Sequence, residues 1–263
     1  AYLSQVISED RLAQSVKKIL QAKYKVGLNQ TNSVNIESLQ KSLDTAEFTA
    51  LQHRLAAASI TVLTNEIYLL PISDLTDAKI AYIPLGKDDG TPFFERLNHY
   101  ANVERLDLIE DRTNLSNYSH LIVGIHQPDN TPWESHRLTV EEKELLYKLS
   151  RRKNVILVSF SNPYALQHIP LDDFEAIVMG YQNNPIAQSK AAQVVFGALG
   201  ANGKFPIDLG AFNVGDGLKL QPIGRLSYGH PEQVGLDLQR LQLIDSMAHM
   251  AITDSMTPGM QIL

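Results

Sequence analysis

Residues 154–160, Asn-Val-Ile-Leu-Val-Ser-Phe, and 174–180, Phe-Glu-Ala-Ile-Val-Met-Gly, decide the fold that the sequence predicts. Each segment is a short apolar run that ends in a turn, the first of them at residues 161–163, Ser-Asn-Pro. A helix-like segment, 185–199, follows the second run and leads into a glycine-rich turn. Short apolar runs without polar alternation, joined by helices, indicate strands that are buried on both faces of a parallel sheet.

The same alternation extends through the middle of the chain. Apolar or β-branched runs predict four earlier strands, at 59–65, 79–85, 103–108 and 120–125. A capping box that begins at Thr139 predicts a helix through Arg152. We therefore expect a doubly wound α/β domain, a three-layer sandwich around a mostly parallel sheet, at residues 36–210. Right-handed crossovers would place its strand-exit loops along one rim.

The ends of the chain have a different pattern. Ser8 is a plausible N-cap for an amphipathic helix that Gly27 ends, and residues 36–58 carry the pattern of one long helix. The polar stretch 29–35 and the glycine-rich stretch 211–230 are predicted linkers. Residues 231–263 begin with a helical pattern and end in what looks like the start of a strand, which indicates a truncated domain.

Composition narrows the classes of function. The 263 residues are 44% hydrophobic and 20% charged, which is ordinary for a globular protein. A net charge of −6 disfavours nucleic acid and anionic membranes as partners, because both reward a basic face. The absence of cysteine excludes disulfides, thiolate metal sites and cysteine catalysis. No transmembrane run and no signal peptide are expected, and the sequence implies no cofactor.

Motifs that carry chemistry are scarce in this sequence. Neither a GxSxG nor an HExxH motif occurs, and the eight histidines include no i, i+4 pair, so no metal site is predicted. The acidic pairs at 88–89, 141–142 and 172–173 are predicted to be solvated loop or cap residues. No catalytic residue is assigned.

One strand-exit loop, 126–136, combines polar side chains with the chain's single tryptophan. An exposed indole there could stack on a sugar or pack against another domain, and it could equally cover the core of its own domain. The candidates for lining a substrate cleft are therefore His126, Gln127, Asp129, Trp133, Glu134 and His136.

Several motifs together resemble glycoside hydrolase family 3. Residues 16–27 resemble the segment that closes the family's catalytic barrel, and 56–72 resemble the first strand of its C-terminal α/β sandwich. The segments Ser-Asn-Pro-Tyr-Ala-Leu at 161–166 and Gly-Ala-Leu-Gly-Ala-Asn-Gly-Lys-Phe-Pro-Ile at 197–207 are similar to later elements of that sandwich. The Asn-Pro-Tyr turn points to the β-N-acetylglucosaminidase branch. Residues 231–245 and 257–263 resemble the opening of a serine β-lactamase-like domain of class C.

This resemblance implies a flavodoxin-like sandwich that accompanies a glycosidase. Residues 1–28 would be the terminal helix of an upstream barrel, and a β-lactamase-like domain would follow downstream as the other partner in the polypeptide. The implied reaction is retaining hydrolysis of terminal N-acetyl-β-glucosaminyl residues, with an amino sugar as ligand. The catalytic groups of this branch belong to the barrel, so this sandwich would serve as scaffold and cleft wall and would be inactive alone. Such fusions imply a periplasmic or cell-surface location.

A stand-alone α/β ligand-binding module of flavodoxin or receiver type is the rival interpretation. A receiver needs an acidic cluster after its first strand and a phospho-acceptor aspartate after its third. Asn65 and Glu66 offer no such cluster if 59–65 is the first strand. A flavin site needs a Ser/Thr/Gly-rich loop after the first strand, and residues 66–70, Glu-Ile-Tyr-Leu-Leu, do not provide one.

Overall fold

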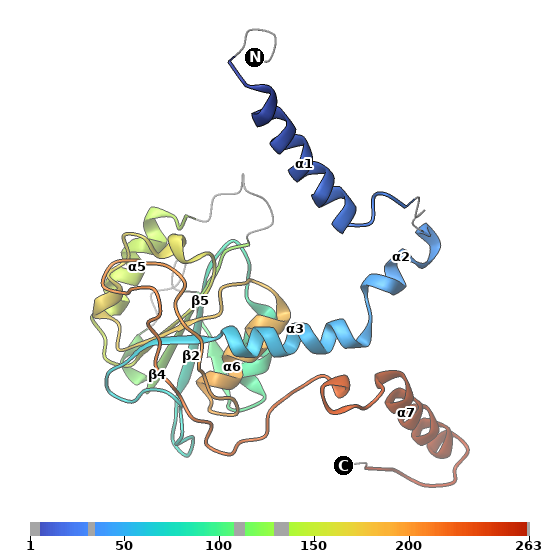
Figure 1. The fold of residues 1–263 in the computed structure, drawn as a ribbon. Helices are drawn as coiled ribbons and strands as arrows, with labels where there is room; N and C mark the ends of the chain where they lie inside the picture. Colours follow the sequence, from blue (N-terminus) through green and yellow to red (C-terminus); the bar gives the residue numbers. More distant parts are fainter. Residues whose placement is uncertain (1–5, 31–34, 108–113, 129–136, 262–263) are drawn as a thin grey trace. The chain divides into compact units, whose positions relative to one another are not determined.

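The computed structural model describes residues 6–30, 35–107, 114–128 and 137–261 (Figure 1). By its internal contacts the chain divides into two units, residues 1–45 and 46–263. The first contains the helices α1, Glu9–Lys25, and α2, Ile36–Leu43. The second contains a six-stranded sheet, the helices around it and the C-terminal helix.

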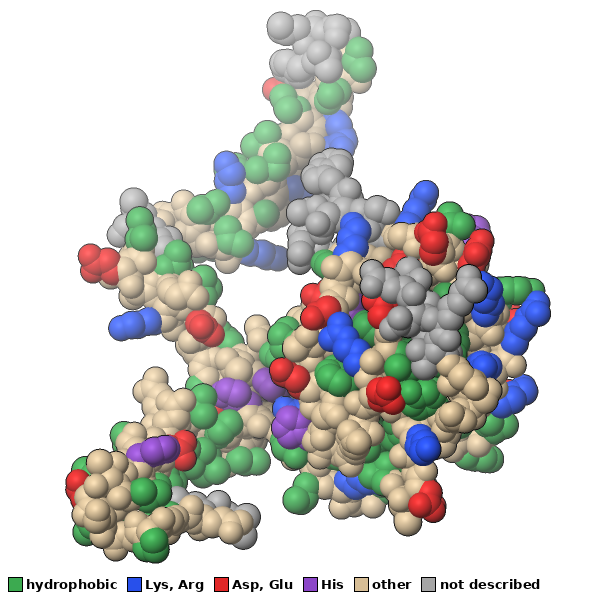
Figure 2. Space-filling model, turned by 180° about the vertical axis from the view of Figure 1, so that it is seen from behind, with side chains coloured by type: hydrophobic (Ala, Val, Ile, Leu, Met, Phe, Trp, Pro, Cys, Tyr) green, Lys and Arg blue, Asp and Glu red, His purple; other side chains and the backbone are tan. Residues whose placement is uncertain are grey.

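Helix α1 is amphipathic, and its apolar stripe is exposed. Ser8 caps it as predicted, since its hydroxyl accepts a hydrogen bond from the Arg11 amide at 3.2 Å. Hydrophobic side chains remain at the surface along this helix, which is visible in Figure 2. The members of this stripe are Leu12, Val16, Ile19, Leu20 and Tyr24.

The single long helix predicted at 36–58 is wrong. Helix α2 ends at Leu43, and α3 occupies Ala46–Ser59. Asp44 between them leaves the helical region, with φ −110° and ψ 69°. Short polar side chains such as those of Asp44 and Thr45 can bond to nearby backbone and so compete with helical hydrogen bonding. The boundary between the two units falls at this break.

The sheet has the strand order β1-β6-β5-β4-β2-β3. Its strands are β1 Thr61–Asn65, β2 Ile80–Gly86, β3 Val103–Arg105, β4 His120–His126, β5 Val155–Phe160 and β6 Ala176–Met179. Strands β2 to β6 are parallel, and β1 runs antiparallel beside β6. All six predicted strands are therefore present, and the expected α/β sandwich with a mostly parallel sheet is confirmed.

Helices cover both faces of the sheet (Figure 1). One face packs against α5, Val140–Ser150, through Leu146 and Leu149. The other face packs against α4, Thr91–Asn98, and α6, Pro185–Val195. Helix α3 contacts α6 from outside. The remaining helical elements are the 3-10 turns η1 Leu115–Asn117, η2 Pro163–Leu166, η3 Leu171–Asp173 and η4 Pro231–Val234, and α7 Leu238–Thr253.

Residues 218–236, here called the C-terminal arm, run along the sandwich before α7 begins. Leu218 donates its amide to the Val62 carbonyl on the outer edge of β1, at 2.7 Å. Leu220 and Ala201 exchange backbone hydrogen bonds of 2.9 and 3.0 Å. Most of the stretch expected as a linker at 211–230 is thus attached to the sandwich over many residues, and it covers an edge that would otherwise be unpaired.

Candidate functional site

The strand order places a topological switch point between β2 and β4. Strand β3 lies on one side of β2, and β4, β5 and β6 follow on the other. In open α/β sheets ligands bind beyond the carboxyl ends of the strands at such a point. The loops at this point are 86–90, after β2, and the segment that starts at His126, after β4. These residues are the candidate functional site.

A buried histidine links strands β2 and β4 to the loop that follows β6. His126 is fully buried, and its Nε2 lies 2.7 Å from the Tyr82 hydroxyl. Its Nδ1 lies 3.0 Å from Oδ1 of Asn183, which also accepts a hydrogen bond of 2.8 Å from Nε2 of Gln188. Since the Asn183 oxygen can only accept, the partners assign the proton to Nδ1 and make Nε2 the acceptor from Tyr82.

The same network reaches the start of α4. Oε1 of Gln188 accepts a hydrogen bond of 3.0 Å from the Phe93 amide, one of the helix-terminal donors that need a partner. Residues from β2, β4, the β6–α6 loop and α6 are therefore joined by one chain of side-chain hydrogen bonds, which ends on a backbone amide of α4. Satisfied buried networks of this kind fix the arrangement of the elements that they join.

Burial determines the charge state of His126. Removal from water, the largest influence, lowers the pKa of His126 to about 4, against smaller opposite effects from Asn183, Asp88 and Asp89. The imidazole is neutral at pH 7, and both of its nitrogens have partners. His126 therefore supports the rim and is not positioned as an exposed general base.

Glycines make room for this histidine. A Cβ on Gly124 would lie 2.6 Å from Nε2 of His126, and one on Gly90 would lie 2.4 Å from the same atom. Gly90 also adopts φ +64°, which favours glycine. The packing explains why a large polar ring fits at the end of an apolar strand.

Gln127 is also buried, with 2% of its surface exposed. Its amide donates to the Phe160 carbonyl at 3.3 Å, and its Nε2 lies at 3.5 Å from the Arg137 carbonyl. Within the described residues its Oε1 has no hydrogen-bond partner. The other four cleft candidates, Asp129, Trp133, Glu134 and His136, lie outside the described residues and remain predictions.

Glu142 contributes a carboxylate to the rim that the sequence assigned only to a helix cap. The predicted capping box with Thr139 is confirmed, with Oε2 accepting from the Thr139 amide at 2.6 Å. Oε1 accepts from the Gly86 amide at 2.7 Å, which ties the start of α5 to the end of β2. The second contact depends on strand order, so no local pattern could predict it. Both oxygens have partners, which makes this a structural carboxylate.

The acidic pair after β2 caps its own loop. Asp88 accepts from the Gly90 amide at 2.8 Å, and Asp89 accepts from both the amide and the hydroxyl of Thr91 at 3.0 and 2.7 Å. These hydrogen bonds lower the pKa of Asp89, whose side chain is also 3.8 Å from Arg105. The cap role predicted for this pair is confirmed.

The topology also corrects the comparison with receivers and flavodoxins. Because β1 is antiparallel, its end at Asn65 is at the opposite side of the sheet, and β2 is the first strand of the parallel set. The loop after β2 does carry two acids, Asp88 and Asp89, but the third strand of the set ends at the buried His126 and not at an aspartate. An acidic loop also disfavours a flavin phosphate. The rival interpretation gains no support at this rim.

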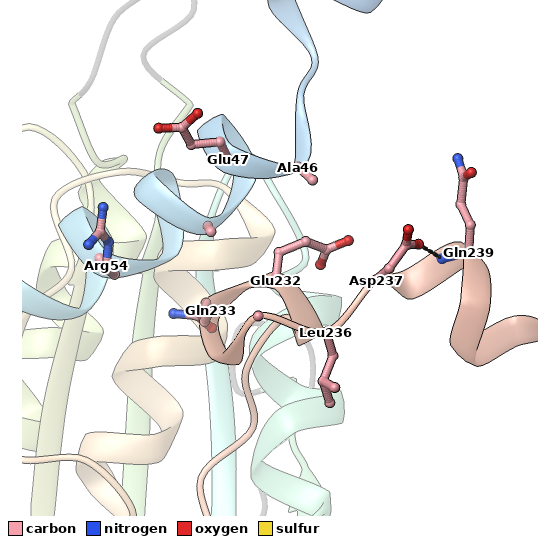
Figure 3. Close-up of a pocket in the computed structure, with 10 residues that line it drawn as sticks. Ala46, Glu47, Arg54, Glu232, Gln233, Leu236, Asp237 and Gln239 are labelled. Atoms are coloured by element: carbon pink, nitrogen blue, oxygen red, sulfur yellow. Dashed lines mark hydrogen bonds between the residues drawn. The ribbon is translucent and has the colours of Figure 1, made fainter.

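Two grooves lie on the second unit away from the switch point. One, of about 630 Å³, separates α3 from η4 and the start of α7, with Glu47, Arg54, Glu232 and Asp237 on its walls (Figure 3). The other, of about 910 Å³, lies between the last turns of α3, the loop that follows β6, and residues 203–206. Among the described residues, no group of three histidine, cysteine or acidic side chains is placed to hold a metal ion. Nor does that part of the chain contain a helix long and apolar enough to cross a membrane.

The parallel strands have the order typical of flavodoxin-like domains, 2-1-3-4-5, with β1 added at the edge. Solved structures of glycoside hydrolase family 3 enzymes share this fold. No protein-family model matches the chain, and no curated protein matches it by sequence.

Three solved structures illustrate the likeness. A fungal multi-domain family 3 β-N-acetylglucosaminidase has a TM-score of 0.54 and 18% identity, over 82% of this chain and 25% of that one. The β-N-acetylglucosaminidase of a Paenibacillus species has a TM-score of 0.52 and 20% identity, over 80% and 41%. The β-glucoside phosphorylase BglX has a TM-score of 0.56 and 17% identity, over 78% and 40%.

These matches show the fold of the chain and how much of each longer enzyme it corresponds to. It spans between a quarter and about two fifths of the length of these three chains. The chain therefore resembles a domain of family 3 glycoside hydrolases.

Proposed function

We propose that the chain is an accessory domain of a family 3 glycoside hydrolase, which acts as scaffold and as a wall of the cleft of an upstream catalytic barrel. The observation that carries the proposal is that the chain has the fold of part of three longer enzymes, two of which are family 3 β-N-acetylglucosaminidases. In this proposal the domain contributes no catalytic residue. The rim supports this role, because the ring nitrogens of His126 and the carboxylate oxygens of Glu142 are all hydrogen-bonded to neighbouring elements of the domain.

The proposed substrate class is a terminal N-acetyl-β-glucosaminide. Two observations support it: the Asn-Pro-Tyr turn at 162–164, which resembles that branch, and the two β-N-acetylglucosaminidases among the similar structures. In the structure Asn162 caps η2 by accepting from the Tyr164 amide at 3.1 Å. The loop 126–136 is the proposed contribution of this domain to the cleft.

The outer helices fit the wider arrangement. The exposed apolar stripe of α1 suits a helix that closes the upstream barrel, as the resemblance of residues 16–27 implies. Helix α7 exposes Leu243, Met247 and Met250, which suits the start of a β-lactamase-like domain whose core would cover them. A periplasmic or cell-surface location is part of the same proposal.

Turnover of an aryl N-acetyl-β-glucosaminide tests the proposal. We expect no activity from residues 1–263 alone, and activity from a longer polypeptide that carries a family 3 barrel upstream. In that longer polypeptide, shortening loop 126–136 should reduce kcat/KM while the unfolding temperature of the sandwich stays unchanged. Turnover by residues 1–263 alone would contradict the accessory role, and unchanged kcat/KM after loop shortening would remove the loop from the cleft.

A further inference from the structure

The C-terminal arm is attached firmly to the sandwich as far as Tyr228. The Tyr228 amide donates to Oε1 of Gln193 at 2.8 Å, and its carbonyl accepts from Nε2 of Gln193 and Nζ of Lys190 at 3.0 and 2.9 Å. The Arg96 guanidinium lies 4.1 Å from the centre of the Tyr228 ring. Helices α4 and α6 therefore hold this part of the arm with both backbone and ring contacts.

Two residues further on, the arm meets α3 through a pair of histidines. The rings of His53, on α3, and His230, on the arm, have centroids 5.5 Å apart at an angle of 42°. Nδ1 of His53 is buried and has no hydrogen-bond partner in the described part of the chain. Figure 2 shows histidine side chains at the surface where the arm leaves the sandwich. Neither histidine belongs to the candidate site at the rim.

Cations surround His53 on the sandwich side. Lys190, on α6, is buried and close enough to act on it, and Arg96, on α4, acts in turn on Lys190. From the arm, His230 faces His53 and is itself paired with the Glu232 carboxylate. That carboxylate can neutralise a charge on His230, whereas none of these groups offers a counterion to His53. A proton on His53 would therefore add a cation beside Lys190 in a half-buried site, with no counterion among these groups.

We propose that His53 and His230 form an acid-released latch that docks η4 and the start of α7 on α3. With the His53 imidazole neutral the two rings pack together and the arm is closed. Protonation of His53 places a cation between Lys190 and His230 and opens the contact beyond Tyr228. The arm up to Tyr228 stays bound through the hydrogen bonds of Gln193 and Lys190 and through the contacts of Arg96 and His99 with the Tyr228 ring.

The direction of the pH dependence follows from the environment. Burial first, then Lys190 and His230, lowers the pKa of His53 below its ordinary value. In the released state that pKa returns toward about 6.5, so the docked state binds fewer protons. Docking is complete above that pH and weakens as pH falls below it, by at most about tenfold per unit for one proton.

A groove lies next to the latch. It lies between α3 and η4, and its lining includes the charged side chains of Glu47, Arg54 and Glu232 (Figure 3). Because α7 follows η4 directly, opening the latch would also release α7 from the sandwich.

The absence of cysteine allows a direct test. Lys148 on α5 and Ser246 on α7 are both exposed, and cysteines at these two positions can carry spin labels for pulsed electron–electron distance measurement. For the whole chain we expect a narrow distance distribution at pH 7.5 and a broad one at pH 5. Far-UV circular dichroism at pH 5 checks that the sandwich remains folded.

Two variants of His53 separate the latch from general acid effects. His53→Gln keeps a neutral polar side chain and should remain narrow at pH 5, whereas His53→Lys carries a permanent charge and should be broad already at pH 7.5. His249→Gln, on exposed α7, is the matched control and should behave as the native chain. The proposal is overturned if the native distribution is the same at both pH values, or if His53→Gln broadens at pH 5 as the native chain does.

Discussion

The Tyr82 hydroxyl and Nε2 of His126 are 2.7 Å apart, with both side chains fully buried on the same face of the sheet. Tyr82 comes from β2 and His126 from the end of β4, so this bond crosses the switch point. It is the first link of the network that continues to Asn183 and Gln188. The rigidity of the rim therefore depends on polar residues that are remote from one another in sequence.

Tyr82→Phe removes only the hydroxyl of this pair. Nε2 of His126 would lose its donor in a site closed to water, and leaving a buried acceptor unsatisfied costs about 1–3 kcal/mol. We expect that loss in the free energy of unfolding by urea. Tyr147→Phe is the matched control, because the Tyr147 hydroxyl accepts from Arg151 on the exposed side of α5 and its loss should change stability by less than about 0.5 kcal/mol. Equal effects of the two variants would contradict the role of the buried pair.

Acid should destabilise the sandwich through His126. Its pKa is about 4 in the folded state and about 6.5 when unfolded, so the unfolded state binds more protons between these values. The contribution of neutral His126 is fully present above pH 6.5 and is lost as pH falls through 4. We expect the stability difference between the native chain and His126→Gln to shrink by on the order of 3 kcal/mol from pH 7 to pH 4.

The imidazole itself provides the control for that measurement. The ring proton shifts of His126 in NMR spectra should not titrate between pH 8 and pH 5. A difference in stability that stays constant with pH, or a His126 that titrates near 6.5, would show that the ring is solvated.

Much of the sheet could be predicted from local pattern alone. Runs such as 155–160 and 120–126 are apolar because both of their faces are covered, and that requirement acts on each strand separately. The antiparallel direction of β1 could not be predicted in this way, since it depends on which neighbour the strand meets. For this reason the comparison with receivers, which treated 59–65 as the first strand, examined the wrong loop.

The candidate site was likewise predictable in part. Its position was predictable, because parallel strands bring their exits to one rim. The burial of His126 was not, since the ring's space depends on Gly124 two residues earlier and its partners come from β2 and from the loop after β6. A glycine two positions before a strand-end histidine lies on the same face of the sheet, and that is the one local signal for a ring that folds back.

Gly124→Ala tests this space directly. The added Cβ would lie 2.6 Å from Nε2 of His126 and 2.9 Å from Cε2 of Tyr82, distances that require both rings to shift. Overpacking of this kind costs about 1–3 kcal/mol or more, so the thermal midpoint should fall by several degrees. Gly259→Ala, where nothing lies within 4 Å, should leave the midpoint unchanged. Equal thermal midpoints for the two variants would contradict the close packing of His126 and Tyr82 around Gly124.

Arg225 fixes the arm to the sandwich ahead of the proposed latch. Its Nη1 donates to the Ile72 and Phe196 carbonyls at 2.6 and 2.7 Å, and its Nη2 donates to the Ser73 carbonyl at 2.7 Å. Arg225→Ala should cost about 2–3 kcal/mol and speed amide exchange at Ile223, which donates to Gly197. Arg225→Lys should recover little of the loss, because an ammonium cannot reproduce the planar fork that reaches three carbonyls.

Arg240→Ala, which removes an exposed guanidinium 3.9 Å from Asp237, is the control and should stay within about 0.5 kcal/mol of the native chain. Full rescue by lysine would mean that charge alone holds the arm, and the geometry of the three carbonyls would then be incidental.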